Sequence, residues 1–88
     1  MTTQQQIEIL KSLANEMNGY AKRDMENLRL FRSMRKKLEC NCYHCGKHGD
    51  KFIWVFTLEN NRNMRLVFDL EFVNRFEGFV KNGRLEWE

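Results

Sequence analysis

Apolar residues recur at every second position from Phe52 to Leu58 and from Met64 to Leu70, and this alternation constrains the fold more than any other feature of the chain. Successive side chains of an extended strand point to opposite faces of a sheet, so residues two apart share a face. The polar run Asn60-Asn61-Arg62-Asn63 interrupts the alternation and fits a turn. The shared apolar face would consist of Phe52, Trp54, Phe56 and Leu58 before the turn, and Met64, Leu66, Phe68 and Leu70 after it. We therefore expect a β-hairpin over residues 51–70. Helices must cover it, because two strands cannot bury such a face alone.

The N-terminal 39 residues have a helical period instead. Apolar residues recur at intervals of three and four at Ile7, Leu10, Leu13, Ala14 and Met17. This spacing predicts a helix from about Gln4 to Asn18, with Asn18-Gly19 as its C-terminal stop. A second helix is expected from Tyr20 to about Glu39. Residues 1–39 are thus predicted to form a helical hairpin.

Helical spacing returns after the hairpin. Apolar residues at this spacing are Phe72, Val73, Phe76, Phe79 and Val80. A C-terminal helix is expected to stop at Asn82-Gly83, with a short edge strand over residues 84–88. The predicted fold is α+β in a single domain, residues 1–88. It comprises a helical hairpin (1–39), a Cys/His loop (40–50), a β-hairpin (51–70), and a helix with a C-terminal strand (71–88).

Composition fits a small folded protein. The chain is 42% hydrophobic and carries a net charge of +3, which is unlike the pattern of a disordered segment. No apolar run is long enough to span a bilayer, and the polar start Met1-Thr2-Thr3 lacks the apolar region of a signal peptide. Three closely spaced cysteines do not suit a secreted disulfide framework. We therefore expect reduced thiols, a cytoplasmic location and no membrane partner.

All three cysteines and both histidines lie between Cys40 and His48. Thiolate and imidazole are zinc ligands, so zinc is the expected cofactor. The segment Cys42-Tyr43-His44-Cys45-Gly46-Lys47 resembles one knuckle of a zinc ribbon or treble-clef site. The resemblance implies that the two cysteines converge on one ion and that Gly46 permits the tight turn.

A second ligand pair is missing from the rest of the chain. Cys40 and His48 could complete the tetrahedron locally, which gives the candidate ligands Cys40, Cys42, Cys45 and His48. Alternatively, two chains could each contribute Cys42 and Cys45 across the axis of a homodimer. In a third interpretation no metal binds, and Cys40 and Cys42 pack as small apolar groups.

The expected second helix is strongly basic. Arg29, Arg32 and Lys36 follow a spacing that places them on one helical face. The candidate contact residues for a nucleic acid or a partner are Arg29, Arg32, Arg35, Lys36, Lys37 and Lys47. Such a ridge can follow a phosphate backbone, although a charge run can also serve only as a solvated face.

These features predict a small non-enzymatic regulatory binding module, with zinc as a stabilising ion, that engages nucleic acid or a nucleoprotein through the basic helix. The alternative is a phage-type inhibitor or adaptor that binds an acidic protein partner. An enzyme is not expected. The sequence has no recognisable pair of catalytic carboxylates, no phosphate-binding glycine loop and no credible nucleophile and base.

Overall fold

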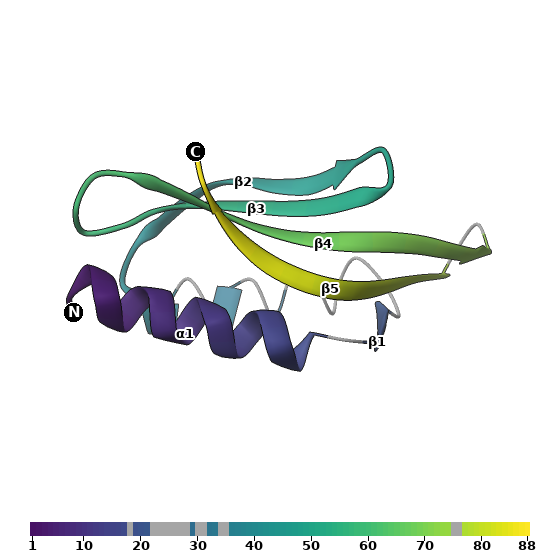
Figure 1. Ribbon diagram of the computed structural model, residues 1–88, viewed down its shortest axis with the longest axis horizontal. Coiled ribbons are helices and arrows are strands. Elements are labelled where there is room, and N and C mark those ends of the chain that lie inside the picture. Colours follow the sequence, from purple (N-terminus) through teal and green to yellow (C-terminus); the bar gives the residue numbers. More distant parts are fainter. Residues whose placement is uncertain (18, 22–28, 30–31, 34–35, 75–76) are drawn as a thin grey trace.

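A single antiparallel sheet with one helix against it makes up most of the described chain. The computed structural model describes residues 1–17, 19–21, 29, 32–33, 36–74 and 77–88. Its elements are α1 (Thr3–Glu16), β1 (Gly19–Ala21), β2 (Asn41–His48), β3 (Lys51–Thr57), β4 (Asn63–Asn74) and β5 (Glu77–Trp87). The strand order is β1-β5-β4-β3-β2. Figure 1 shows α1 running along one face of this sheet.

The first predicted helix is confirmed as α1, which begins one residue before Gln4 and ends at Glu16. Thr2 caps it, because its Oγ1 accepts from the backbone N–H of Gln5 while Gln5 Oε1 accepts from the backbone N–H of Thr2. Leu10, Leu13 and Ala14 are buried, as the apolar period indicates. No helix among the described residues has the length and apolar character needed to cross a bilayer.

The predicted β-hairpin is also confirmed, as the antiparallel pair β3 and β4. Its turn is supported by Asn61, whose φ of 63° lies in the left-handed region that asparagine tolerates. Trp54, Phe56 and Phe68 have no exposed surface, and their rings meet edge to face at Trp54. The predicted apolar face is therefore the core, which lies between the sheet and α1.

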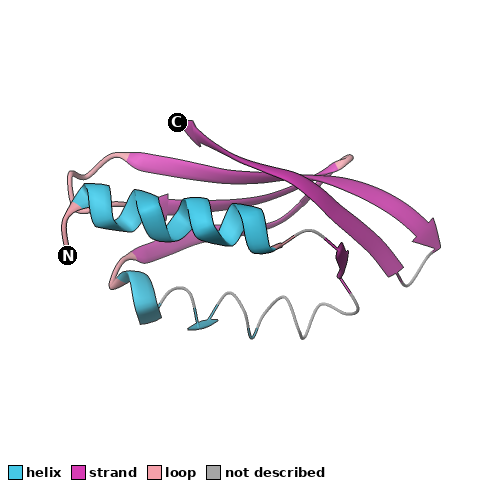
Figure 2. Cartoon of the chain, turned by 60° about the horizontal axis from the view of Figure 1, so that its bottom comes forward, coloured by secondary structure: helices cyan, strands magenta, loops and turns pink. Residues whose placement is uncertain are grey.

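The prediction of an N-terminal helical hairpin over residues 1–39 is wrong. Gly19–Ala21, where the second helix was expected to begin, form β1 and pair with Gly78–Val80 of β5. Residues 29, 32–33 and 36–38 are helical, and Figure 2 shows residues 36–38 beside the N-terminal half of α1. The other residues of the expected second helix, 22–28, 30–31 and 34–35, lie outside the described part of the chain.

The predicted C-terminal helix is wrong as well, because β4 continues to Asn74 and β5 runs from Glu77 to Trp87. The expected short strand is the end of β5. The register between these strands shifts between Val67 and Asp69 and again between Phe72 and Asn74. An extra residue breaks the period of two. Phe72 and Val73 lie on β4 while Phe79 and Val80 lie on β5, so the helical spacing between them crosses from one strand to the next. Phe76 lies outside the described residues.

The expected Cys/His loop over residues 40–50 is wrong too, because most of it forms β2. His48 pairs with Lys51, so the connection to β3 is the two-residue turn Gly49-Asp50. Gly49 has a φ of 60°, which a glycine adopts without steric cost. The fold is therefore a five-stranded sheet with an N-terminal helix.

Helix α1 approaches β5 most closely at Gly83. A Cβ atom at this position would lie 2.6 Å from the carbonyl oxygen of Ala14 and 2.6 Å from Phe68 Cε1. The neighbouring Asn82 has a φ of 53° and lies in the bulged part of β5. Gly83, expected to stop a helix, instead lets a helix backbone rest on the strand.

We expect Gly83→Ala to destabilise the protein by about 2 to 3 kcal/mol, because the added methyl group must push α1 or Phe68 out of place. Urea unfolding followed by circular dichroism measures the change. The matched control is Gly46→Ala on β2, where a Cβ would meet nothing within 4 Å. An equal effect of the two substitutions would contradict the close packing of α1 on β5.

Candidate functional site

The cysteine and histidine cluster is extended along β2. Cys40 precedes the strand, Cys42 and Cys45 lie within it, and His48 is its last residue. The two ends of an eight-residue strand are about 23 Å apart, so the structure places Cys40 and His48 far from each other. Among the described residues, no group of three or more potential ligands gathers around one point. Zinc binding by Cys40, Cys42, Cys45 and His48 stays a prediction.

Two members of the cluster are nevertheless aligned by a β-bulge. Cys42 pairs with Phe56 and Cys45 pairs with Trp54, although the cysteines are three positions apart and their partners are two positions apart. Tyr43 is the extra residue. Without it, the two cysteines would take opposite faces of the strand. Their register positions are instead opposite two residues that share the core face of β3.

The predicted basic residues near the start of β2 are exposed. Arg29, Arg32, Lys36 and Lys37 are helical and exposed, while Arg35 lies outside the described residues. The adjoining Leu38 is fully buried in the core with Leu10 and Leu13. This segment, residues 29–37, is called the basic segment below. Leu38 fixes its C-terminal end against α1.

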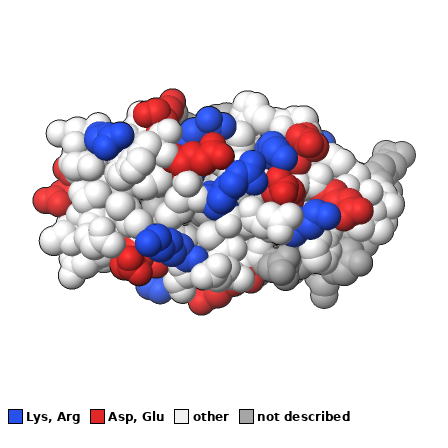
Figure 3. Space-filling model, viewed as in Figure 1, with Lys and Arg blue, Asp and Glu red and all other residues white. Residues whose placement is uncertain are grey.

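Most other cations of the described chain form ion pairs, whereas Lys47 and Arg62 lie over the rings of Phe72 and Trp87. On the sheet, Lys51 and Arg84 pair with Asp69, Lys81 pairs with Glu71, and Arg65 approaches Glu86. Figure 3 shows such neighbouring positive and negative groups on one face of the molecule. Arg29, Arg32, Lys36 and Lys37 form no ion pair with a described residue. Among the described residues, no carboxylate neutralises their charge.

Lys47, the last predicted contact residue, has a different environment. It lies on β2, and its Nζ is 4.4 Å from the centre of the Phe72 ring. The side chain of Phe72 is 53% exposed on β4. A cation over an aromatic face is attracted to the ring but keeps its charge. Lys47 is thus exposed and positive on β2. It contacts the ring of Phe72, a residue that was predicted to lie in a helix.

Asp69 is the centre of the ion pairs on the opposite face of the sheet from α1. Its carboxylate accepts from Lys51 Nζ at 2.6 Å, Asn82 Nδ2 at 3.1 Å and Arg84 at 3.2 Å. The hydrogen bond from Lys51, followed by those from Asn82 and Arg84, holds the pKa of Asp69 far below its usual range. Asp69 in turn raises the pKa of Arg84. This network lies beside the small apolar cluster Ile53, Val55 and Val67.

We expect Asp69→Asn to lower stability at neutral pH, because Lys51 and Arg84 lose their shared anion. The pKa of Asp69 is depressed in the folded state, so its stabilising effect is complete above the unfolded pKa of about 3.9. It should decline as the pH falls below about 4, where only the unfolded chain takes up the proton. Urea midpoints of both proteins between neutral and acidic pH measure this difference.

The matched control for Asp69 is Glu59→Gln, which removes an exposed carboxylate without a described ion pair. We expect its stability to stay within about 0.5 kcal/mol of the original chain at neutral pH. If the stability difference between Asp69→Asn and the original chain did not become smaller at acidic pH, the assigned role of the carboxylate would be contradicted.

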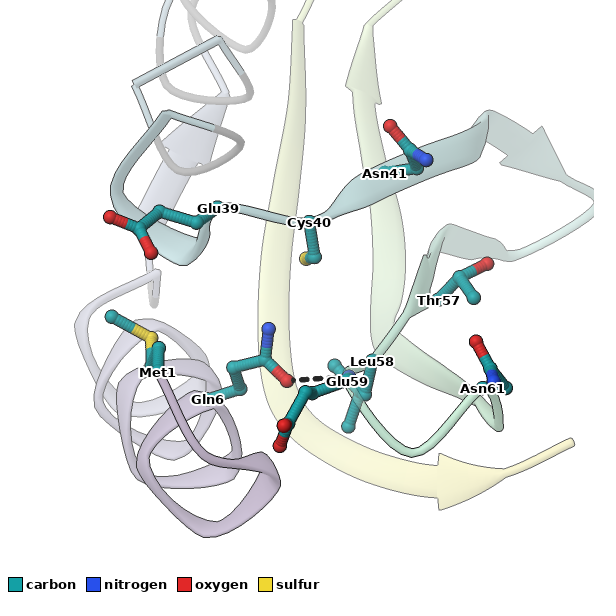
Figure 4. A pocket seen from close by; sticks show the side chains of 9 residues that line it. All are labelled: Met1, Gln6, Glu39, Cys40, Asn41, Thr57, Leu58, Glu59 and Asn61. Carbon is teal, nitrogen blue, oxygen red and sulfur yellow. Dashed lines mark hydrogen bonds between the residues drawn. The ribbon is translucent and has the colours of Figure 1, made fainter.

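A pocket of about 360 Å³ lies where the start of β2 meets the turn between β3 and β4. Figure 4 shows its lining residues, which are Met1, Gln6, Glu39, Cys40, Asn41, Thr57, Leu58, Glu59 and Asn61. Gln6 is 2% exposed. Its Nε2 donates to the Leu38 carbonyl at 3.1 Å, and its Oε1 accepts from the Glu59 backbone N–H at 2.9 Å. One side chain thus joins α1, the end of the basic segment and a sheet turn.

Gln6 was not among the residues predicted to be buried or functional. A signal was present, because Gln6, Leu10 and Leu13 have the spacing of one helical face. A polar residue in line with core positions indicates a buried hydrogen-bonding group.

We expect Gln6→Ala to cost about 2 to 3 kcal/mol of stability, because the Leu38 carbonyl and the Glu59 N–H lose a buried partner. The control is Gln4→Ala, an exposed position on the same helix, which should change stability by less than about 0.5 kcal/mol. Chemical unfolding of both variants provides the measurement. Equal stabilities of the two variants would show that Gln6 does not hold these elements together.

The chain matches no protein-family model, no curated protein and no solved structure. Its function is therefore inferred from the geometry and charge of its own residues.

Proposed function

We propose that the chain is a small non-enzymatic binding module that engages nucleic acid, alone or within a nucleoprotein, through its basic segment. The observation that carries this proposal is the set of exposed cations without an ion pair among the described residues: Arg29, Arg32, Lys36 and Lys37. Arg35 and Lys47 complete the proposed contact residues. The proposed location is the cytoplasm.

Cations without internal partners suit a polyanion for an energetic reason. A paired cation such as Lys81 must give up its carboxylate before it can bind a phosphate, which costs up to about 1 kcal/mol for an exposed pair. An unpaired cation gives up only water and releases the counterions condensed on the nucleic acid. Binding of this type is strong at low salt and carries little sequence preference. The basic segment therefore favours contact with the backbone over reading of bases.

The attachment of the basic segment supports the same function. Leu38 is buried in the core directly after Lys37, and its carbonyl accepts from Gln6. Cations next to such an anchor lose less conformational freedom on binding than cations on an unattached tail. The anchor thus makes the C-terminal end of the basic segment a better docking point than its charge alone.

Zinc is proposed as a stabilising ion and not as a reactant. Cys42 and Cys45 occupy aligned register positions on β2, which suits two ligands of one ion. Cys40 and His48 lie toward opposite ends of β2, so a complete set of four ligands needs groups that this strand does not bring together.

We expect the double variant Lys36→Gln, Lys37→Gln to bind a short fluorescent DNA duplex about tenfold more weakly at low salt. Its plot of log affinity against log salt concentration should be shallower by about two, one for each lost phosphate contact. Fluorescence anisotropy over a salt series provides both quantities.

The matched control is Lys11→Gln, Lys81→Gln, which removes the same charge from two cations that pair with Glu8 and Glu71. Equal losses in the two double variants would mean that net charge alone attracts the duplex, and would overturn the assignment to the basic segment. If the original chain did not bind the duplex but retained a stoichiometric acidic protein after nuclease treatment, the inhibitor or adaptor function would replace this proposal.

A further inference from the structure

Strand β2 lies at one margin of the sheet that the described residues form. It is the last strand in the order β1-β5-β4-β3-β2, and its inner side pairs with β3 from Asn41 to His48. No described residue pairs with its outer side, as the margin of the sheet in Figure 1 shows. The backbone N–H and C=O groups on that side suit an added extended strand.

The two edge strands of the described sheet differ in length. At the opposite margin, β1 has only three residues. β2 has eight residues and no proline, which allows several consecutive backbone hydrogen bonds to a partner strand. Long exposed edges are sites where another strand can be added. The outer side of β2 is therefore the better docking edge.

The charges around β2 favour a second copy of the same chain. The strand contains no acidic residue, and its positive group Lys47 lies near its C-terminal end. The exposed Glu39 lies just before its N-terminal end. Antiparallel pairing about a two-fold axis places the basic end of each strand beside the acidic start of the other. A parallel arrangement would place like charges together.

The bulge at Tyr43 suggests a register for this pairing. With the two-fold axis between Tyr43 and His44, Cys42 of one chain lies opposite Cys45 of the partner subunit, and the reverse pair is equivalent. Because of the bulge, Cys42 and Cys45 of one chain lie opposite residues that share one face of β3. In this register the four cysteine positions of the dimer surround the two-fold axis. Four cysteines are also a ligand set that zinc accepts.

We propose that the outer side of β2 is the homodimer interface of this protein, in an antiparallel register that places Cys42 opposite Cys45 of the partner subunit. The sheet then continues across the axis from one chain to the other. This interface lies on β2 and does not use the basic segment, so it can be tested independently of nucleic-acid binding.

The test uses two variants of the full chain, Cys40→Ser with Cys42→Ser, and Cys40→Ser with Cys45→Ser. Each variant has a single cysteine, which excludes a disulfide within one chain. Sedimentation of each variant in reducing buffer measures its oligomeric state. Mild oxidation with copper phenanthroline, followed by non-reducing electrophoresis, then detects cross-links in each variant and in their equimolar mixture.

We expect both variants to sediment as dimers and to cross-link poorly alone, because each cysteine then faces a serine. In the mixture, about half of the dimers combine the two variants and bring Cys42 opposite Cys45, so about half of the protein should cross-link. Monomers of both variants would overturn the proposal. Dimers in which the mixture cross-links no better than the separate variants would overturn the register and the interface with it.

Discussion

The structure depends on the burial of one aromatic face of the sheet beneath α1. Trp54, Phe56 and Phe68 have no exposed surface, and α1 reaches them because Gly83 lets its backbone approach β5. Large aromatic side chains supply much of the burial energy of a chain this small. Leu38 joins the same core, so the burial that stabilises the sheet also fixes the end of the basic segment.

Unbroken periodicity explains which parts of the fold could be predicted from sequence. The apolar positions of α1 repeat with a helical period, and the core face of β3 and β4 repeats at every second residue up to Leu70, so both predictions were correct. Beyond Leu70, Phe72 and Val73 lie on β4 and Phe79 and Val80 on β5, so a helical spacing that crosses from one strand to the next misled the prediction. The bulge at Tyr43 had the same effect, because a spacing of three between Cys42 and Cys45 suggested a turn.

The candidate site was predictable only where local charge defines it. Arg29, Arg32, Lys36 and Lys37 are exposed, in agreement with their polarity and spacing. The contrast between these four cations, which form no ion pair with a described residue, and the paired cations of the sheet appears only in the structure. Lys51 and Asp69 are 18 residues apart and meet because β3 and β4 pair in one register. The sequence alone does not give this register, so it cannot show which cations form ion pairs.

The central claim is that the basic segment, and not the ion-paired face of the sheet, contacts nucleic acid. Titration of the isotope-labelled protein with a short DNA duplex, followed by amide NMR, tests it most directly. We expect the largest chemical-shift changes at Arg29, Arg32 and residues 36–38, and small changes around Asp69 and Arg84. Largest changes around Asp69 and Arg84, or none at the basic segment under saturating duplex, would contradict the claim.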